Sequence, residues 1–215
     1  MNLLQISNIL KHYVVGSEGN ISKRQENSFL IKSSGARLDM LTEDDLVLCD
    51  LNQIDISKYE KKPSMEYNFH ALLYNMNSDI NYIIHTHPIN VMKIVCSPLI
   101  KKFSNVRFFP DQIVYNERKS CIVPYAHPGK KLSDQIERFI KIFIDENNFF
   151  PNTILLKNHG LITVGNTLKF TITSTQICEK SAEIFLNNID LDLLSEVEIN
   201  ELLLDDNEMY RRNII

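Results

Sequence analysis

The sequence predicts an α/β fold in which helices cover a β-sheet, built as one domain over residues 1–215. Apolar runs with the period of a helix alternate along the chain with shorter runs typical of strands, and this alternation favours a layered arrangement. A chain of 215 residues with 44% apolar residues can bury one sizeable core. Because the sequence contains no internal repeat and no low-complexity linker, we expect a single domain.

The first third of the chain is expected to hold a helix and then strands. Apolar residues at helical spacing predict a helix that ends before Gly16: Leu3, Ile6, Leu10 and Tyr13. Residues 21–31 read as a hairpin that turns at residues 25–27, and a turn at residues 33–35 follows. Residues 46–48 form the next apolar strand.

The middle of the chain is expected to hold a helix, a strand and a less regular segment. Pro63 is suited to the first position of a helix, since its missing N–H needs no partner there. The residues behind it repeat at helical spacing and predict one buried stripe: Met65, Phe69, Leu72, Leu73 and Met76. Residues 83–87 then read as a strand, whereas the stretch from about residue 98 to residue 125 shows no clear period.

The last third of the chain is expected to alternate again between helix and strand. Apolar residues at helical spacing predict a helix over residues 132–144. Residues 154–156 and 161–164 predict either two strands about a tight turn or one kinked strand, with Asn158-His159-Gly160 between them. Residues 177–185 and 197–204 read as closing helices.

The composition excludes several classes of partner. The net charge of −4 and the absence of any Lys/Arg block argue against a nucleic acid or an anionic membrane as the partner. No apolar run approaches the length of a membrane span, and the N-terminus lacks the pattern of a secretory signal. The four cysteines show no CxxC spacing, so we expect reduced thiols in a cytoplasmic protein.

Three histidines follow strand-like runs and suggest a metal site. Because the side-chain period of a strand is two, His85 and His87 project from the same face. His159 lies beside Gly160 in the second candidate turn. One such histidine alone is more often structural. Together they match a catalytic zinc site with three protein ligands and an open position.

A metal with an open position acts as a Lewis acid for a carbonyl and hydroxyl oxygen and stabilises an enediolate, but this chemistry also needs a base. Glu66 is the candidate, in the segment Pro63-Ser64-Met65-Glu66. A carboxylate in the first turn of a helix is also common without any function, because the helix dipole favours it.

Five short motifs occur in one order along the chain: Gly19-Asn20, Ser34-Gly35, Pro63-Ser64-x-Glu66, His85-Thr86-His87-Pro88 and Asn158-His159-Gly160-Leu161. Each is weak alone, but their order and spacing together are specific. From about residue 3 to residue 188 the sequence resembles the class II aldolase/adducin family, zinc-dependent sugar-phosphate aldolases related to fuculose-1-phosphate aldolase. The resemblance implies a three-layer α/β/α domain around a mixed, mainly antiparallel sheet.

The resemblance also implies roles for individual residues. His85, His87 and His159 would be the ligands of Zn²⁺ or another divalent metal. Glu66 would be the acid/base and a fourth ligand while substrate is absent. The pocket for a substrate phosphate would be lined by Gly19, Asn20, Ser34, Gly35 and Ser64. Glycine-turn N–H groups, an amide and hydroxyls at a helix N-terminus are what an anion needs.

One position departs from the family pattern. Family aldolases that bind phosphate usually carry a second serine where this chain has Met65, and a thioether cannot donate a hydrogen bond. Lys32 or Arg37 could replace the lost donor, although either residue type is more often solvated at the surface.

The other polar candidates carry less signal. His70 is expected on the surface of the Glu66 helix, with a role behind Glu66 as the alternative, and His127 is expected in a loop. By the resemblance, a loop tyrosine and a C-terminal tyrosine from an adjacent subunit help protonate the leaving oxygen, and Tyr115 and Tyr210 are the candidates. A homotetramer with sites at subunit interfaces follows from the same resemblance.

The expected function is therefore a metal-dependent aldolase that reversibly cleaves a ketose or ketose 1-phosphate to dihydroxyacetone (phosphate) and an aldehyde. The motifs equally admit the other reactions of the family, namely epimerisation of a sugar phosphate, dehydration and decarboxylation. A non-catalytic module like the adducin head domain is the alternative of another class, and the intact histidines weigh against it.

Overall fold

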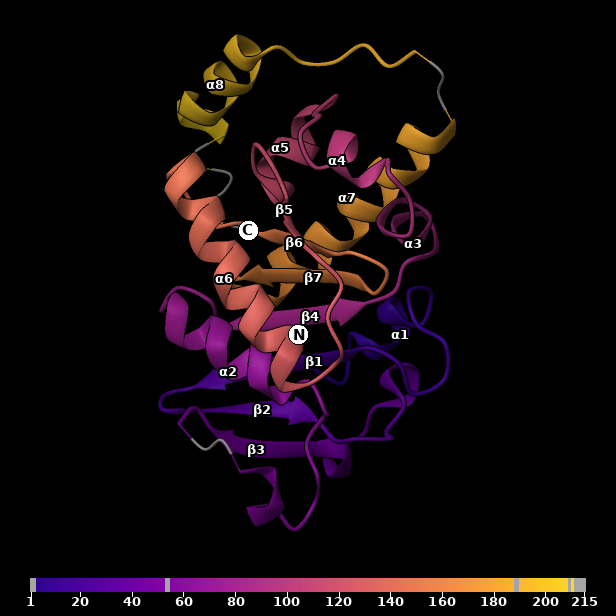
Figure 1. The fold of residues 1–215 in the computed structure, drawn as a ribbon, viewed down its shortest axis with the longest axis vertical. Helices are drawn as coiled ribbons and strands as arrows, with labels where there is room; N and C mark the ends of the chain where they lie inside the picture. The colour runs from indigo at the N-terminus through magenta and orange to yellow at the C-terminus, as the bar shows by residue number, and fades with distance from the viewer. Residues whose placement is uncertain (1–2, 53–54, 188–189, 209, 211–215) are drawn as a thin grey trace.

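The computed structural model describes residues 3–52, 55–187, 190–208 and 210. A seven-stranded sheet in the order β3-β2-β1-β4-β7-β6-β5 forms its centre (Figure 1). The strands are β1 (Asn20–Gln25), β2 (Ser28–Lys32), β3 (Leu46–Asp50), β4 (Tyr82–Thr86), β5 (Cys121–Val123), β6 (Thr153–Leu156) and β7 (Gly160–Gly165).

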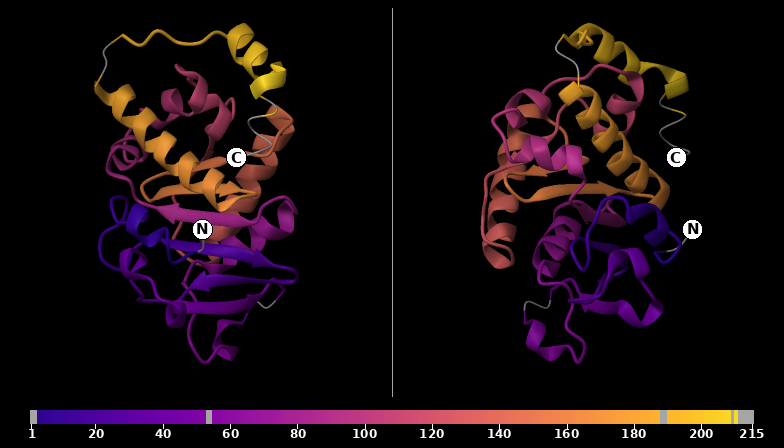
Figure 2. Two further views of the ribbon diagram at one scale, coloured as in Figure 1. Left: turned by 180° about the vertical axis from the view of Figure 1, so that it is seen from behind. Right: turned by 90° about the vertical axis from the view of Figure 1, so that its right-hand side faces the viewer.

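Helices cover both faces of this sheet (Figure 2). The helices are α1 (Ser7–Leu10), α2 (Tyr67–Met76), α3 (Ile89–Val95), α4 (Ile100–Phe103), α5 (Pro110–Asn116), α6 (Lys130–Asn147), α7 (Leu168–Asn187) and α8 (Glu196–Leu204). Three short 3₁₀ helices, η1 (Leu38–Met40), η2 (Glu43–Asp45) and η3 (Ile56–Lys58), lie in the connections around β3. Helices α2 and α6 pack together on one face, and α1, α3 and α7 lie on the other.

The strand directions confirm the predicted mixed, mainly antiparallel sheet and three-layer α/β/α architecture. Within the described residues, β5 and β6 form the one parallel pair, and the other neighbours run antiparallel. Strand β4 lies between β1 and β7, so that His85 is opposite Asn20 on one side and Ile162 on the other. The central strand therefore carries the first histidine between the two halves of the chain.

Side chains alternate between the two faces of β4, as the period of a strand requires. Ile83 lies in the core under α2 and α6, whereas Ile84 packs with α1 and α7. His85 follows Ile83 by two residues and therefore faces α2, where the Phe69 ring meets it edge-on at 5.7 Å between centroids. The α2 face is thus the polar, functional side of the strand end.

The predicted helix beginning at Pro63 is wrong in its start. The helix begins at Tyr67, and Pro63 instead forms an antiparallel bridge with Ser33. The Ser64 N–H donates to Lys32 O at 2.9 Å, so this backbone continues the sheet beyond β2 and cannot also be helical. A local rule for proline was overridden by pairing with a distant segment.

The other boundaries differ less from expectation. The N-terminal helix is shorter than the apolar spacing predicts, since α1 spans Ser7–Leu10. The stretch without a clear period contains α4, α5 and β5. The two strands about a tight turn are confirmed, because β6 and β7 pair antiparallel around residues 157–159. No helix among the described residues is both long enough and apolar enough to cross a membrane.

Candidate active site

The three predicted histidines converge at one point. His85 is the last residue but one of the buried strand β4, His87 follows that strand, and His159 comes from the turn between β6 and β7. Thr86 pairs with Leu161, so the end of β4 lies beside the start of β7. Asn158 holds this turn in the left-handed region with a φ of 56°. One ligand nitrogen from each histidine lies within 4.8 Å of the others.

The Nδ1 atoms of His85 and His87 each have a hydrogen-bond acceptor. His85 Nδ1 lies 2.9 Å from the carbonyl oxygen of Leu161, which can only accept, so this nitrogen carries the proton. His87 Nδ1 lies 3.0 Å from Glu18 Oε2 and donates to that carboxylate for the same reason. The two Nε2 atoms face each other at 3.1 Å. With its proton on Nδ1, a neutral His85 points the lone pair of its Nε2 into the cluster.

Burial keeps His85 and His159 neutral. Burial, followed by the neighbouring His87, lowers the pKa of His159 to about 4. The same two causes, burial first, hold the pKa of His85 well below its usual value. His159 Nδ1 is buried with no hydrogen-bond partner among the described residues. Neutral imidazoles with unused nitrogens are what a divalent metal requires of its ligands, so the residues present fit the implied metal.

Two glycines allow the close approach around these histidines. A Cβ on Gly160 would lie 2.5 Å from His87 Cδ2 and 2.8 Å from the carbonyl oxygen of Thr86. On the other side of β4, a Cβ on Gly19 would lie 2.8 Å from His85 O, and Gly19 also has a φ of +71°. The cluster is therefore compact because a glycine stands at the start of β7 and another directly before β1.

Glu66 lies beside the histidines at the N-cap position of α2. Its Oε2 is 3.3 Å from His85 Nε2, and its Oε1 is 3.3 Å from His159 Nε2. Burial raises the pKa of Glu66, and a hydrogen bond from Asn20 acts against this rise. Because both imidazoles are neutral, these contacts are not ion pairs. Glu66 Oε1 is buried and has no hydrogen bond among the described residues. This oxygen is therefore available as a further metal ligand.

The predicted phosphate pocket is partly assembled next to Glu66. Asn20 Nδ2 donates to Ser64 Oγ at 3.2 Å and to Glu66 Oε2 at 2.9 Å. Ser34 lies on the neighbouring segment, where its N–H donates to Lys62 O at 2.9 Å. Gly35 follows with a φ of +79° and open space where a Cβ would project. Hydrogen bonds thus join Asn20, Ser64 and Glu66, and the Ser34-Gly35 turn lies against the backbone that leads to Ser64.

Lys32 is not the solvated surface charge that its residue type suggests. It is only 2% exposed, and its ammonium donates to Ser17 O at 3.0 Å and to Ala36 O at 2.6 Å. Burial lowers the pKa of Lys32, and the charges of Asp45 and Glu66 oppose this effect. Its position between the Gly19 and Gly35 turns puts a buried cation at the predicted phosphate pocket.

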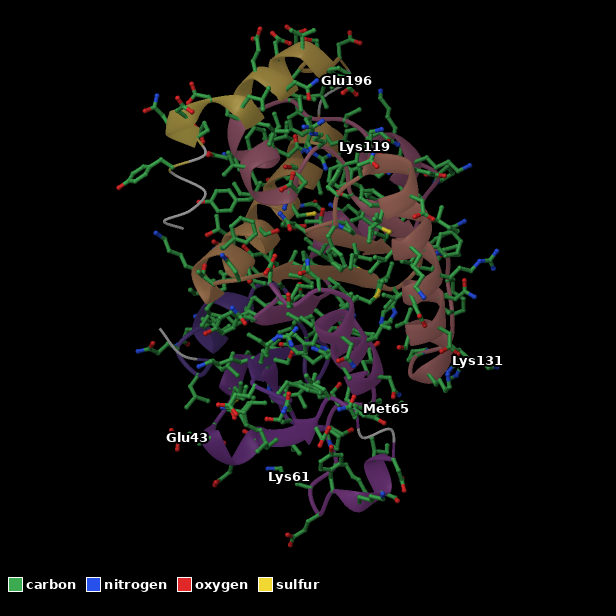
Figure 3. The ribbon with its side chains drawn as sticks, turned by 90° about the vertical axis from the view of Figure 1, so that its left-hand side faces the viewer. Glu43, Lys61, Met65, Lys119, Lys131 and Glu196 are labelled. Atoms are coloured by element: carbon green, nitrogen blue, oxygen red, sulfur yellow. The ribbon has the colours of Figure 1, made fainter. Side chains whose placement is uncertain are left out.

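The side chains of Arg37 and Met65 are both exposed. Arg37 is exposed and forms a two-pronged ion pair with Asp39, with the shorter contact at 2.7 Å. Met65 is 61% exposed and projects from the surface beside Ser64 (Figure 3).

The two tyrosine candidates do not join the histidine cluster within one chain. Tyr115 lies in α5, where its ring packs against Phe170 at 5.4 Å between centroids. Phe170 adjoins Gly165, at the opposite end of β7 from Gly160. Tyr210 lies beyond α8 and is 67% exposed.

Two further residues lie beside this cluster, of which reasoning from the sequence placed His70 wrongly and missed Glu18. His70 is fully buried rather than on the helix surface, and its Nε2 lies 2.5 Å from Asn20 Oδ1. Its spacing of four residues from Glu66 was a usable signal, since such pairs share a helix face. Glu18, which contacts His87, carries no motif in the sequence. His127 lies in an exposed loop as expected.

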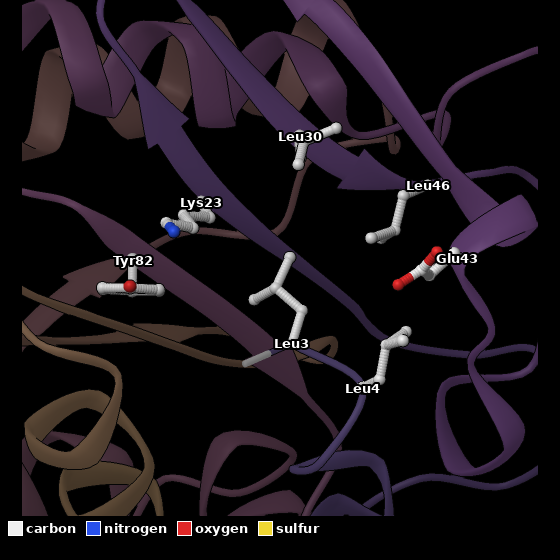
Figure 4. Close-up of a pocket in the computed structure, with 7 residues that line it drawn as sticks. All are labelled: Leu3, Leu4, Lys23, Leu30, Glu43, Leu46 and Tyr82. Atoms are coloured by element: carbon white, nitrogen blue, oxygen red, sulfur yellow. The ribbon is translucent and has the colours of Figure 1, made fainter. Parts of the chain in front are cut away.

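A separate pocket lies away from this cluster. It is lined by Lys23, Leu30, Leu46 and Tyr82 among others (Figure 4). Lys23 pairs with Tyr82 at the ends of β1 and β4 opposite the histidines. This pocket is largely apolar and holds none of the predicted site residues.

The sequence matches the family model described as "Class II Aldolase and Adducin N-terminal domain" over residues 6–186. The chain belongs to the class II aldolase and adducin family. The family predicted from the five motifs is therefore confirmed.

Individual relatives of known name support this membership. An L-fuculose phosphate aldolase of Methanococcus maripaludis is 31% identical over 182 residues, which cover 83% of this chain and 91% of the relative. A 3-oxo-tetronate 4-phosphate decarboxylase of Haemophilus influenzae is 25% identical, with 88% of each chain covered. The crystal structure of YgbL from Klebsiella pneumoniae, titled a putative aldolase/epimerase/decarboxylase, is 26% identical with a TM-score of 0.75, covering 93% of this chain and 95% of that one.

Proposed function

We propose that this protein is a metal-dependent aldolase that reversibly cleaves a ketose or ketose 1-phosphate to dihydroxyacetone or its phosphate and an aldehyde. The observation that carries the proposal is the convergence of three imidazoles, two of them kept neutral by burial, beside a buried carboxylate. Polar groups suited to an anion border the same carboxylate.

The metal would be held by His85, His87 and His159, with Glu66 as a fourth ligand in the absence of substrate. Zinc is the first expectation, because three imidazoles with an open position are a frequent catalytic zinc set. When bound, a divalent metal supplies Lewis-acid chemistry, which polarises a ketone and its neighbouring hydroxyl. The contact between His87 and Glu18 holds that imidazole in the tautomer with a free Nε2.

Glu66 is proposed to move the proton of the reaction. In the cleavage direction, the hydroxyl beside the breaking C–C bond passes its proton to solvent water, and its carbon becomes the aldehyde. The electron pair of that bond passes to the carbon next to the ketone, which then accepts a proton from Glu66. Burial raises the pKa of Glu66, and this favours a carboxyl group that can hold and return a proton.

The substrate phosphate is proposed to lie in the pocket of Gly19, Asn20, Ser34, Gly35 and Ser64. Ser64 Oγ accepts from Asn20 Nδ2 and from the Glu66 N–H, so within the described residues its own proton is left for another acceptor. Lys32 adds a buried cation close by, and we propose that it compensates for the donor that Met65 lacks. Arg37 is committed to Asp39 and is not part of this proposal.

The proposed assembly is a homotetramer with sites at subunit interfaces. Tyr115 and Tyr210 lie away from the histidines of their own chain, so a catalytic role for either requires a neighbouring subunit. A cytoplasmic location is proposed because the four cysteines, all in the described ranges, are free thiols.

Decarboxylation is the second candidate. The named decarboxylase among the relatives covers 88% of this chain, and the same metal chemistry supports the loss of CO₂ next to a ketone. The two reactions leave different products from their substrates, so a substrate panel separates them.

The test is Glu66→Gln in a panel of ketoses, ketose 1-phosphates and 3-oxo acid phosphates. The amide keeps the size of the side chain but cannot carry the proton, so turnover should fall by about two orders of magnitude or more. Metal content, measured by elemental analysis, should be largely kept because three histidines remain. Retro-aldol turnover that survives this change would contradict the proposed role, and a wild-type protein without stoichiometric metal would favour the non-catalytic module.

A further inference from the structure

A row of polar side chains continues behind Glu66 into the core. Asn20 and Ser22 lie two residues apart on β1, and Glu66, His70 and Tyr74 lie four residues apart along α2. Two strand residues rise by about 6.6 Å and four helix residues by about 6 Å, so the two rows stay in step. We call these five residues the polar ladder. Every member is buried.

Short contacts connect the polar ladder from one end to the other. Asn20 Oδ1 lies 2.5 Å from His70 Nε2, and His70 Nδ1 lies 2.7 Å from Ser22 Oγ. Ser22 Oγ lies 2.7 Å from the Tyr74 hydroxyl. With the contact from Asn20 Nδ2 to Glu66 Oε2 at 2.9 Å, the row reaches the carboxylate without a gap.

The carboxylate decides the direction of each hydrogen bond. An ionised Glu66 can only accept, so Asn20 must turn its amide nitrogen toward Glu66 and its oxygen toward His70. His70 Nε2 must then donate, and its Nδ1 must accept from the Ser22 hydroxyl. Ser22 in turn accepts from Tyr74. Each donor in this row polarises the next, and the row ends on the negative charge.

His70 has the properties that this direction requires. Burial lowers the pKa of His70 to about 3, so the ring is neutral and one nitrogen must be an acceptor. Its ring stacks on Phe69 at 4.5 Å between centroids, which holds its plane. A neutral ring held in one plane can present a proton only along the axis from Ser22 to Asn20.

We propose that His70 is a positioning residue that fixes the Asn20 amide with its N–H group on Glu66. Without His70, the buried Asn20 oxygen has no donor, so the amide orientation that donates to Glu66 loses one of its two supports. This inference rests on the proposed function for its catalytic consequence, whereas the hydrogen-bond direction is a property of the folded chain alone.

The direction is measured by NMR, independently of turnover. Long-range ¹H–¹⁵N spectra of the imidazole distinguish a proton on Nε2 from one on Nδ1. We expect His70 in the Nε2–H tautomer. Ser22→Ala should keep this tautomer, because the Asn20 oxygen still requires a donor, whereas Asn20→Ala, which removes that oxygen, should allow both tautomers. A wild-type His70 protonated at Nδ1 would overturn the proposal, even for a protein in which no aldolase activity is found.

The catalytic consequence is measured by a double-mutant cycle on kcat. His70→Phe keeps the ring stack but removes the donor, and we expect a loss of about 10-fold or more, the scale of outer-sphere changes around metal sites. His70→Gln keeps a donor and an acceptor and should recover most of this loss. In the Asn20→Ala background, His70→Phe should cost little more, because its effect passes through Asn20. Additive losses would refute the positioning role.

Thr163→Val is the matched control. Thr163 forms a buried hydroxyl pair with Thr175 at 2.7 Å on the opposite face of the sheet. Thr163→Val removes a buried hydroxyl–hydroxyl hydrogen bond like that of Ser22 and leaves the contacts of the polar ladder unchanged. It should lower stability as Ser22→Ala does but leave kcat unchanged, and an equal loss of kcat in both would show that destabilisation alone explains the effect. If His70→Phe does not fold, Ser22→Ala takes its place in the cycle.

Discussion

The replacement Gly160→Ala tests the proposed metal site most directly. Gly160 has no positive φ, so the backbone accepts alanine and the effect is one of space alone. The added Cβ would lie 2.5 Å from His87 Cδ2 and 3.2 Å from His85 Cε1. Both contacts involve rings that carry proposed ligand nitrogens.

The size of the effect follows from these distances. An ordinary contact begins at 3.4 Å, so the His87 ring must move by about 0.9 Å, the difference between 3.4 and 2.5 Å. Metal–ligand distances tolerate only about 0.2 Å. Either the His87 ring or the start of β7 would therefore have to move, and His87 could no longer reach the proposed metal. Loss of a hydrogen-bond partner behind a ligand lowers metal affinity by about 10- to 100-fold. Loss of a ligand itself should lower zinc affinity by more than this, and a 100-fold loss corresponds to about 2.7 kcal/mol.

The assay is competition for zinc against a chromophoric chelator. The control is Gly35→Ala. Its added Cβ would lie in open space, but the φ of +79° at this position is unfavourable for alanine. That change should lower the free energy of unfolding by about 1 kcal/mol while the zinc affinity stays as in the wild type. A Gly160→Ala protein with unchanged zinc affinity would show that the histidines do not converge on a metal.

Three further predictions concern the surroundings of this site. Glu18→Gln should weaken zinc binding by about 10- to 100-fold in the same competition assay, because His87 loses its charged partner; unchanged binding would rule out this support. Met65→Ser should tighten binding of inorganic phosphate by about 1.5 to 3 kcal/mol in calorimetry, and weaker binding would indicate a neutral sugar as substrate. Lys32→Met should lower phosphate affinity by at least about 10-fold, whereas equal affinity would place the anion elsewhere.

The histidine cluster was predictable because its signals are local. The period of two along residues 85–87 fixes a shared face, and the glycine after His159 marks a tight turn. The strand and turn positions then follow from apolar patterning. Which strands are neighbours was not predictable from these patterns, and the family resemblance implied only a mixed, mainly antiparallel sheet.

The misses share one physical cause, which is contact with a distant segment. Pro63 is extended because Ser33, 30 positions earlier, pairs with it. His70 and Lys32 are buried because β1 and two glycine turns supply partners that helix or strand spacing does not reveal. The helix α5 does carry a local signal, since Pro110 occupies its first turn. Its apolar residues are too few to establish a period.

The position of β4 has a consequence for folding. This strand joins β1 and β2 on one side to β7 and β6 on the other, so the four proposed ligands come together only after both halves of the chain have paired. A cation bound by them has little affinity for the unfolded chain and would close loops between residue 66 and residue 159, much as a covalent cross-link does. At 100 times its dissociation constant it adds about 2.7 kcal/mol to the free energy of unfolding. Removal of the metal by a chelator would therefore destabilise the pairing of β4 with β1 and β7 at the centre of the sheet, rather than one loop at its edge.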